Sequence, residues 1–519
     1  YDNSCDGANN SWSQVGQTIS GNDLLSADSL TSALGESVAI NSDGSIIATL
    51  NSNYSSQTPV AYVGRVDVYQ LQGGMWERLG EPILGSDLPG SYNRIDGRDG
   101  EGIDISADGL TITFSGKTSQ NQWAVFAYTY INGQWVQKGS TMTATNGLGG
   151  TVTMSDNGNT IAAYAFPQGQ SYNIGQLQIY IFENNDWVLT GGFYGTSTNS
   201  SLGYFGFQHN VYNGSFGTSM SLSGDGLTLA VGAPGWYHPN VNSFTYDDTV
   251  HFLHYVGGEW IPKGQIIFYD VPDGYATHSF GRDISLSYDG DVAVVGIPYG
   301  NYGSSGWNSG GKANVYRYFD QAQSWGQVGE SLEVEGQYQT GHTVSINGAG
   351  NMVALGGSNG YSGSTNATAS IFQNINDNWV LVGEQFDLST SSIGVEGGGG
   401  VSSNSYVEFD YSGSTIVMGT PVYEGVVRVF SLNAGIIPAP EGDTVQTFCG
   451  EATIGGLVVE GENIQWYDSA SGGSILDSST VLSDGQIVYA SQTIGECESQ
   501  SRLMVEIDIV ICTFDNPCA

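Results

Sequence analysis

One acid-rich segment has the residue types of a calcium site. It carries four carboxylates within nine residues, interspersed with glycines: Asp96, Asp99, Glu101 and Asp104. Ca²⁺ prefers several oxygen ligands on a flexible loop, and this composition supplies them, although the spacing differs from that of an EF-hand loop. The segment therefore predicts a calcium site, and calcium is the one cofactor that the sequence suggests. The alternative is a solvated acidic loop, because acidic residues are numerous throughout the chain.

Aromatic and small polar residues fill several long segments between strand-like stretches. The clearest are residues 234–248 and 298–311, and residues 51–62 and 195–215 have a similar composition. Rigid aromatic rings beside Asn, Ser and Gly are typical of antibody-like recognition surfaces. We therefore predict that a glycan or a cell-surface protein binds to six side chains: Trp236, Tyr237, His238, Tyr246, Tyr302 and Trp307. The alternative is that these segments only pack over the end of the fold.

No catalytic constellation is visible in the sequence. The chain has no H-E-x-x-H or P-loop motif. His251 and His254 are three residues apart in a predicted strand, so their side chains face opposite ways and cannot bind one metal. We therefore predict that the protein is not an enzyme. A polysaccharide lyase or hydrolase is the alternative, and it would require acid and base groups that converge near a central channel.

Composition limits the class of protein. The chain has 51 Asp and Glu against 12 Lys and Arg, a formal net charge of −39. This charge disfavours nucleic acid and anionic membrane as partners. No apolar run approaches the roughly 20 residues of a membrane span. With 76 Gly in 519 residues and 12% aromatic residues, the chain is typical of an all-β protein with many tight turns and a packed core.

Seven Trp residues mark an internal repeat. Each is followed four residues later by Gly, and consecutive Trp residues are 52 to 73 residues apart: Trp12, Trp76, Trp135, Trp187, Trp260, Trp325 and Trp379. Between them lie three strand-like runs, the first two joined by a tight turn, as in ESVAINSDG followed by SIIATL. Four antiparallel strands repeated seven times predict a seven-bladed β-propeller. Because the chain opens on a Trp strand and its final unit lacks one, we expect the N-terminal strand to close the last blade.

Two of these units share a second motif. Their first strand follows Phe216-Gly217 or Phe280-Gly281, and their second strand ends in Gly232-Ala233-Pro234 or Gly296-Ile297-Pro298. The pattern resembles the FG-GAP repeat of integrin α-subunit propellers and of many bacterial surface proteins, and the resemblance covers about residues 12–433. It implies a propeller fold. Calcium loops of that family carry several spaced Asp residues in one turn, whereas the hairpin turns here have at most one or two.

The chain changes character after the repeats. A Pro-containing linker at residues 436–442 separates an expected propeller domain, residues 1–435, from residues 443–519. Here Cys449 and Cys497 flank Trp466, which begins a W-Y-D-x-x-x-G-G string. This resembles the Ig-like modules of secreted Bacteroidota proteins. The resemblance implies an Ig-like β-sandwich with a Cys449–Cys497 disulfide, and export by type IX secretion.

The remaining motifs concern covalent modification. Two pairings of the remaining cysteines are open. Either Cys512 and Cys518 pair with each other and close a small loop, or Cys5 pairs with one of them. Four Asp-Ser/Thr-apolar triplets resemble the O-glycosylation acceptor of Bacteroidota, with acceptors Ser29, Thr249, Thr444 and Ser469.

The sequence as a whole predicts an exported or cell-surface recognition protein whose process is adhesion. It would bind its partner through the long connections at one end of the propeller, because variable loops on a rigid scaffold commonly carry binding. Two alternatives stay open. One is a structural subunit of an extracellular filament or coat, whose partners are other chains of that assembly. The other is the polysaccharide-degrading enzyme.

Overall fold

The computed structural model describes residues 11–21, 34–52, 54, 63–88, 94–95, 102–118, 120, 122–144, 147–165, 176–194, 216–234, 248–269, 279–299, 310–334, 337–358, 367–375, 377–383, 385–387, 405–421, 425–433, 440, 442–459, 461–469, 473–494, 497–499 and 502–510. The chain divides into two compact units, Ser13–Ser431 and a second that combines Tyr1–Trp12 with Leu432–Ala519. The described residues form an all-β protein, with short 3-10 turns at Gly85–Asp87 (η3) and Ile454–Gly456 (η4). None of the described helical segments is long and apolar enough to cross a membrane.

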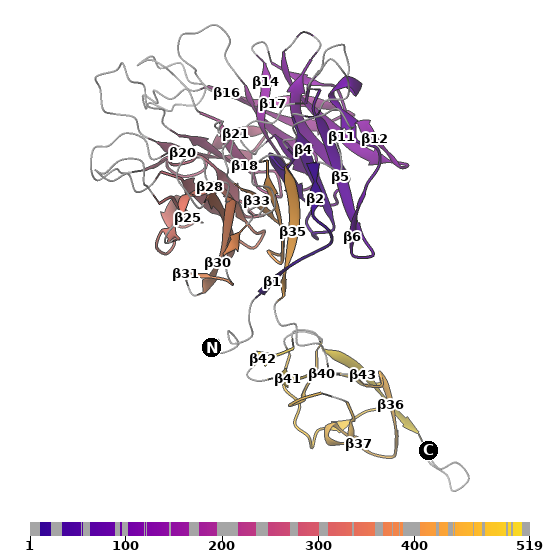
Figure 1. Cartoon of the computed structure of the whole chain (residues 1–519). Helices are drawn as coiled ribbons and strands as arrows, with labels where there is room; N and C mark the ends of the chain where they lie inside the picture. The colour runs from indigo at the N-terminus through magenta and orange to yellow at the C-terminus, as the bar shows by residue number, and fades with distance from the viewer. Residues whose placement is uncertain are drawn as a thin grey trace. The chain divides into compact units, whose positions relative to one another are not determined.

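The strands between residues 37 and 194 form three antiparallel sheets (Figure 1). Sheet 1 contains β3 (Ser37–Ile40), β4 (Ile46–Asn51), β5 (Arg65–Gln72), β6 (Met75–Arg78) and β7 (Ile83–Leu84). Sheet 2 contains β8 (Arg94–Ile95), β9 (Ile103–Ile105), β10 (Thr111–Lys117), β11 (Trp123–Ile131), β12 (Gln134–Gln137) and β13 (Met142–Thr143). Sheet 3 contains β14 (Leu148–Met154), β15 (Thr160–Ala165), β16 (Gln176–Glu183) and β17 (Asp186–Tyr194).

Four more antiparallel sheets follow. Sheet 4 contains β18 (Ser219–Leu222), β19 (Thr228–Ala233), β20 (Thr249–Val256), β21 (Glu259–Pro262) and β22 (Ile267–Phe268). Sheet 5 contains β23 (Ile284–Leu286), β24 (Val292–Ile297), β25 (Lys312–Phe319), β26 (Ser324–Gln327) and β27 (Leu332–Glu333). Sheet 6 contains β28 (Tyr338–Ile346), β29 (Met352–Ser358), β30 (Ala367–Ile375), β31 (Asn378–Leu381) and β32 (Phe386–Asp387). Sheet 7 contains β33 (Tyr406–Phe409), β34 (Thr415–Thr420) and β35 (Val426–Asn433), together with β1 (Ser11–Gln14) and β2 (Ile19–Ser20).

Sheet 7 joins the two ends of the repeat region. Both β1 and β2 pair with β35, so the N-terminal strand takes the fourth place in the last sheet (Figure 1). This pairing confirms the expectation drawn from the position of Trp12.

The seven sheets are linked in a closed circle. We call β3, β9, β14, β18, β23, β28 and β33 the first strands of sheets 1 to 7. Each contacts the next in this order, and β33 contacts β3. Backbone hydrogen bonds of 2.8–3.4 Å repeat this circle at the turn after each first strand. From N–H donor to carbonyl acceptor, they run from Ser42 to Ala107, Ala107 to Asp156, Asp156 to Gly224, Asp225 to Tyr288, Tyr288 to Gly348, Gly348 to Tyr411, and Tyr411 to Ser42. The circle returns to its starting residue, so every sheet has a neighbouring sheet on both sides.

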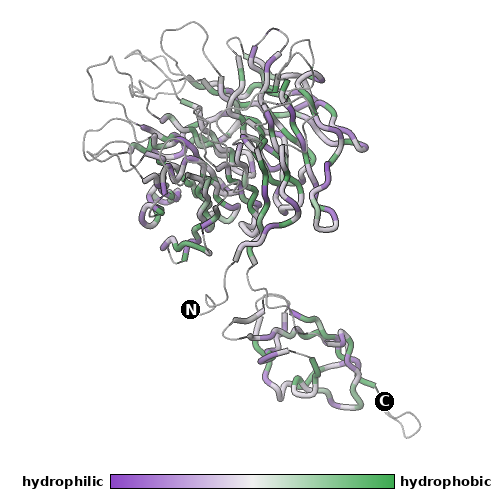
Figure 2. Tube along the Cα trace, viewed as in Figure 1, coloured by the Kyte–Doolittle hydropathy of each residue, from purple (hydrophilic) through white to green (hydrophobic). Residues whose placement is uncertain are grey.

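Apolar side chains fill the spaces between neighbouring sheets. Separate clusters lie between sheets 1 and 2, 2 and 3, 3 and 4, 4 and 5, 5 and 6, and 7 and 1. The second strands β4, β19 and β24 are buried along their whole length, because a neighbouring sheet covers each face. Hydrophobic stretches follow the strands in Figure 2, and hydrophilic ones occur at many turns.

The W-x-x-x-G pattern connects neighbouring sheets. Five indole N–H groups, those of Trp76, Trp135, Trp187, Trp325 and Trp379, donate at 2.7–3.1 Å to the carbonyls of Val15, Leu79, Lys138, Lys263 and Val328. Each carbonyl belongs to the residue before the motif's Gly in the preceding unit. That Gly leaves room for the indole, since a Cβ on Gly264 would lie 2.9 Å from Cδ1 of Trp325. The pattern therefore records contacts between units.

Trp260 departs from this arrangement. Gly191, the motif glycine of the preceding unit, lies inside the continuous strand β17 and is not among the glycines with positive φ. The buried Nε1 of Trp260 has no hydrogen-bond partner among the described residues.

This difference gives a matched pair of substitutions. Both Trp325 and Trp260 are almost fully buried, so Trp→Phe removes a similar apolar volume at each site. We expect Trp325→Phe to lower the free energy of unfolding by about 1–2 kcal/mol more than Trp260→Phe, because only Trp325 leaves a carbonyl without its donor. Urea unfolding followed by circular dichroism measures both values, and equal losses would contradict the assignment.

The Phe-Gly and Gly-Ala-Pro segments also meet across sheets. The N–H of Gly281 donates to the carbonyl of Gly296 in its own unit at 3.0 Å. The Ser219 hydroxyl of sheet 4 donates to the carbonyl of Gly281 at 2.8 Å. A Cβ on Gly232 would overlap that same carbonyl. The glycines of this motif therefore allow two backbones to approach closely.

The C-terminal unit has its own core. A four-stranded sheet has the order β36 (Val445–Cys449), β43 (Leu503–Val510), β40 (Ile487–Ser491) and β38 (Gln465–Tyr467), with β36 parallel to β43. Two further pairs are β37 (Ala452–Thr453) with β39 (Val481–Leu482), and β41 (Thr493–Ile494) with β42 (Cys497–Glu498). Trp466 is buried in this core.

Candidate functional site

Seven side chains occupy equivalent places in the first strands, each five residues before the glycine of the following turn: Ala39, Asp104, Thr153, Ser221, Ser285, Ser345 and Glu408. We call them the axial belt. Six of them accept a hydrogen bond from a backbone N–H of the next sheet. The donors to Asp104, Thr153, Ser221, Ser285 and Ser345 are Met154, Leu222, Leu286, Ile346 and Phe409, at 2.7–3.1 Å. Ile40 donates to Glu408.

Ala39 has no side-chain oxygen to accept the equivalent N–H of the next sheet, which is that of Ile105. Asp104 accepts this N–H instead. One carboxylate oxygen of Asp104 accepts the N–H of Met154, and the other accepts its neighbour Ile105 at 2.7 Å. Asp104 therefore has a structural role in the belt.

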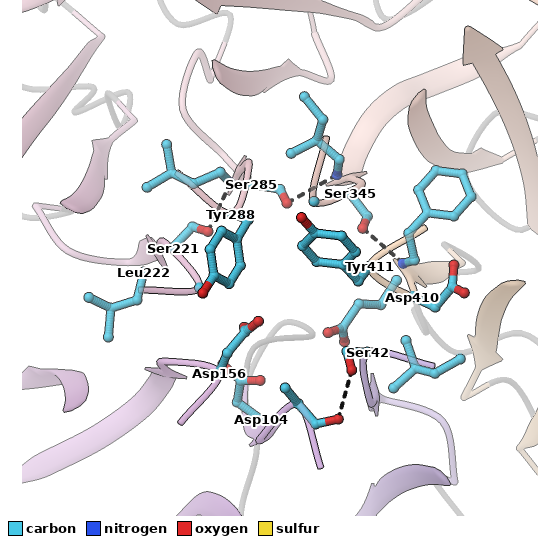
Figure 3. A pocket seen from close by; sticks show the side chains of 18 of the residues that line it. Ser42, Asp104, Asp156, Ser221, Leu222, Ser285, Tyr288, Ser345, Asp410 and Tyr411 are labelled. Carbon is cyan, nitrogen blue, oxygen red and sulfur yellow. Dashed lines mark hydrogen bonds between the residues drawn. The ribbon is translucent and has the colours of Figure 1, made fainter. Parts of the chain in front are cut away.

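Two adjoining cavities lie along the belt and share six of its residues. Their volumes are about 150 and 130 Å³, and we call them together the axial cavity. The larger also contacts Asp156, Tyr288 and Tyr411, and the smaller contacts Asp283. In Figure 3 the two Tyr rings project into the larger cavity, with Asp104 and Asp156 on another of its sides. Pockets for drug-sized ligands are roughly 300–1,000 Å³, so this space suits a smaller group than an oligosaccharide.

Negative charge gathers in the axial cavity. Desolvation raises the pKa of Asp104 to about 7. Desolvation also raises the pKa of Glu408 well above its usual range, and the charges of Asp104, Asp283 and Asp156 raise it further. The described residues that line the two cavities include no Lys, Arg or His. Desolvated carboxylates without a cationic partner must take up protons or meet a cation.

Two tyrosines stand where the larger cavity opens at the turns. Tyr288 and Tyr411 are 41% and 47% exposed, and their ring centroids lie 5.5 Å apart in an edge-to-face arrangement. Tyr288 lies over Gly224 and Tyr411 lies over Gly348, because a Cβ on either glycine would overlap the ring. The backbone circle described above fixes the main chain of both tyrosines.

The aromatic residues predicted to bind a ligand lie outside the described residues. This holds for Trp236, Tyr237, His238, Tyr246, Tyr302 and Trp307, and also for the acidic residues Asp96, Asp99 and Glu101. Asp104 belongs to β9 and lines the axial cavity. No three His, Cys, Asp or Glu side chains of the described ranges are placed to hold one metal ion.

The predicted modification sites fall in different surroundings. Thr249 is 1% exposed and its hydroxyl lies 3.1 Å from Nε2 of His251, so it is closed to a glycosyltransferase in the folded chain. Thr444 is exposed and Ser469 is partly exposed, whereas Ser29 lies outside the described residues. Cys449 ends β36 with an exposed side chain, Cys497 begins β42, and Cys512 and Cys518 lie outside the described residues. The cysteine pairings therefore stay predictions.

The sequence-based search missed Glu408, Asp156, Tyr288 and Tyr411. The signal that identifies them is the alignment of the seven first strands on their turn glycines. That alignment puts Glu408 in a column otherwise made mainly of Ser and Thr, and it puts Asp156, Tyr288 and Tyr411 together in the column three residues later.

Comparison with known proteins adds similarities of fold. No family model and no curated protein matches the chain. The β-propeller domain of Cps50 (Swd1) from Myceliophteria thermophila matches with a TM-score of 0.44 and 11% identity, covering 81% of this chain and 99% of that one. The β-propeller domain of the Trilobed protease from Pyrococcus furiosus matches with a TM-score of 0.42 and 11% identity, covering 77% and 93%. Oligogalacturonate lyase from Vibrio parahaemolyticus matches with a TM-score of 0.44 and 8% identity, covering 82% and 100%.

Proposed function

We propose that the protein is an exported recognition protein that binds a glycan or a cell-surface protein. In this proposal, sheets 1–7 are the blades of a seven-bladed, FG-GAP-like β-propeller, and residues 443–519 form an Ig-like spacer. The closed circle of first strands supports the propeller. The circle gives a rigid scaffold on which connecting segments can carry binding.

One observation carries the binding role. Two aromatic-rich connections, residues 234–248 and 298–311, begin in neighbouring sheets at strand ends that are linked through Gly281. The first follows β19, which ends at Ala233, and the second follows β24, which ends at Ile297. Gly232 packs on the carbonyl of Gly281, whose N–H donates to Gly296. Two segments rich in Tyr, Trp, Asn and Ser thus start side by side.

Binding of the full chain to a glycan array and to cell-surface extracts, with calcium and with EDTA, tests this proposal. We expect Trp236→Ala with Trp307→Ala to lose most of the binding. Phe319→Ala is the matched control, because Phe319 is 45% exposed at the end of β25. Binding that survives the double substitution would contradict the proposed surface, and EDTA sensitivity would decide whether calcium takes part.

A further inference from the structure

We propose that the axial cavity binds a primary ammonium group on an alkyl stem, which packs against the exposed rings of Tyr288 and Tyr411 and meets the carboxylates of Asp156 and Glu408. This site is separate from the recognition surface proposed above. It rests on four features of the described residues, namely the chemistry of the belt, the position of Asp156, the two tyrosines and the size of the cavity.

The belt does not need a carboxylate at position 408. At Thr153, Ser221, Ser285 and Ser345, a hydroxyl oxygen accepts the backbone N–H of the next sheet. Glu408 accepts the equivalent N–H of Ile40. A hydroxyl would serve the fold there without placing a charge in a desolvated channel. The carboxylate therefore exceeds what the architecture requires.

Asp156 is a second excess charge. Its equivalents in the other six first-strand turns are Ser42, Ala107, Gly224, Tyr288, Gly348 and Tyr411, none of which is acidic. Its backbone completes the circle of hydrogen bonds, but no described residue donates a hydrogen bond to its carboxylate. The Asp156 carboxylate is thus available to a ligand in the larger cavity.

The two tyrosines provide the surface for an alkyl stem. They are exposed aromatic rings, edge to face, beside a cavity lined by carboxylates (Figure 3). Faces of aromatic rings attract organic cations, and their apolar surface packs against methylene groups. Both rings are set over glycines, which fixes them in place before a ligand arrives.

Cavity size and donor geometry select the ammonium over other cations. The described side chains bring no three metal-type ligands together, which disfavours a bare metal ion. A volume of about 150 Å³ admits a short alkylamine and excludes an oligosaccharide. An ammonium has three N–H donors, and Glu408, Asp156 and the belt hydroxyls offer acceptors to match them.

The ammonium has two sources, a free diamine or a lysine side chain of a partner protein. Calorimetric titration of the full chain at pH 8 with cadaverine, and separately with a short peptide that carries one Lys, distinguishes them. The same peptide with norleucine in place of Lys is the uncharged control. We expect at least one amine probe to bind and the norleucine peptide not to bind.

The variants separate this site from general attraction to an acidic protein. Asp156→Asn with Glu408→Ser should weaken amine binding at least tenfold, since Ser keeps the belt acceptor. Glu81→Gln with Glu259→Gln removes the same charge from exposed positions and should leave binding unchanged. Tyr288→Ala with Tyr411→Ala should weaken binding several-fold, and Trp236→Ala with Trp307→Ala should not change it. Absence of amine binding to the unmodified chain, or equal losses in the two charge variants, would overturn the proposal.

Discussion

Gly419→Ala should lower the free energy of unfolding by about 3 kcal/mol, since it overpacks the contact that joins the last sheet to the first. Gly419 lies in β34. A Cβ there would overlap the carbonyl oxygen of Gly35 and lie 2.9 Å from Cγ1 of Val38. Backbone atoms cannot turn away as a flexible side chain can, so sheets 7 and 1 must move apart. That movement disturbs their shared apolar cluster and the closure of the circle.

Gly192→Ala is the matched control. Gly192 is also a strand glycine without positive φ, but nothing lies within 4 Å of a Cβ placed on it. We expect this substitution to change the free energy of unfolding by no more than about 0.5 kcal/mol. Chemical unfolding of both variants under one set of conditions makes the comparison. A loss in Gly419→Ala no larger than in the control would show that the contact between sheets 7 and 1 tolerates added volume.

Lowering the pH from 8 to 6.5 should stabilise the protein, and Glu408→Ser should remove much of that dependence. The folded-state pKa values of Asp104 and Glu408 are raised, to about 7 for Asp104 against its ordinary 3.8. In this window the folded state therefore binds more protons than the unfolded chain. Stability then falls as the pH rises, by up to about 1.4 kcal/mol per pH unit for each proton taken up. At pH 8 we accordingly expect Glu408→Ser to be more stable than the unmodified protein.

His342 should oppose this trend below pH 6.5, where Asp104 and Glu408 still bind more protons in the folded state than in the unfolded chain. Desolvation, with a smaller effect from Arg282, lowers the pKa of His342 to about 3, so His342 is neutral when folded and takes up a proton when unfolded. Its contribution to stability is present above its ordinary pKa of 6.5 and is lost as the pH falls. Melting temperature measured from pH 8 to pH 5, with Glu81→Gln as the control, tests both trends. An unchanged slope between pH 8 and 6.5 in Glu408→Ser would contradict the assignment to Glu408.

The pH response and the proposed ammonium site have the same physical origin. Carboxylates that lack a cationic neighbour are stabilised either by protons or by a bound cation. An amine that binds the ionised carboxylates should therefore oppose the loss of stability at pH 8. This coupling relates the axial cavity to stability without requiring any movement of the sheets.

The repeated pattern of the sequence was sufficient to predict the all-β fold and its strand order. The turn glycines, the alternating runs and the seven Trp residues are local signals, and each unit must use them to bury its faces against its neighbours. The pairing of β1 with β35 could also be predicted, because the final unit lacks a Trp strand. The Trp-Gly contacts explain why each Trp is followed by Gly at a constant spacing of four residues, since an indole of one unit packs against the glycine of the preceding unit.

The axial cavity could not be predicted from local pattern. Asp104, Asp156 and Glu408 are far apart in the chain, and they converge only because every first strand turns one edge toward the same axis. Asp104 illustrates the limit: its neighbours in sequence suggested a calcium loop, whereas its place in β9 makes it an acceptor for two backbone N–H groups. Hydrogen bonds between units, and the loss of solvent that closure of the circle produces, are properties of the assembled sheets.

The sequence by itself therefore determined the strands, their turns and the contacts that repeat from one unit to the next, because those depend on residues at fixed local spacing. Tertiary structure alone decided which charges meet. It set the pKa values of Asp104 and Glu408, placed Tyr288 beside Tyr411 and left Asp156 without a donor among the described residues. The physical reason is that desolvation and electrostatic interaction depend on distance in space, which here joins residues about 50 to 300 positions apart.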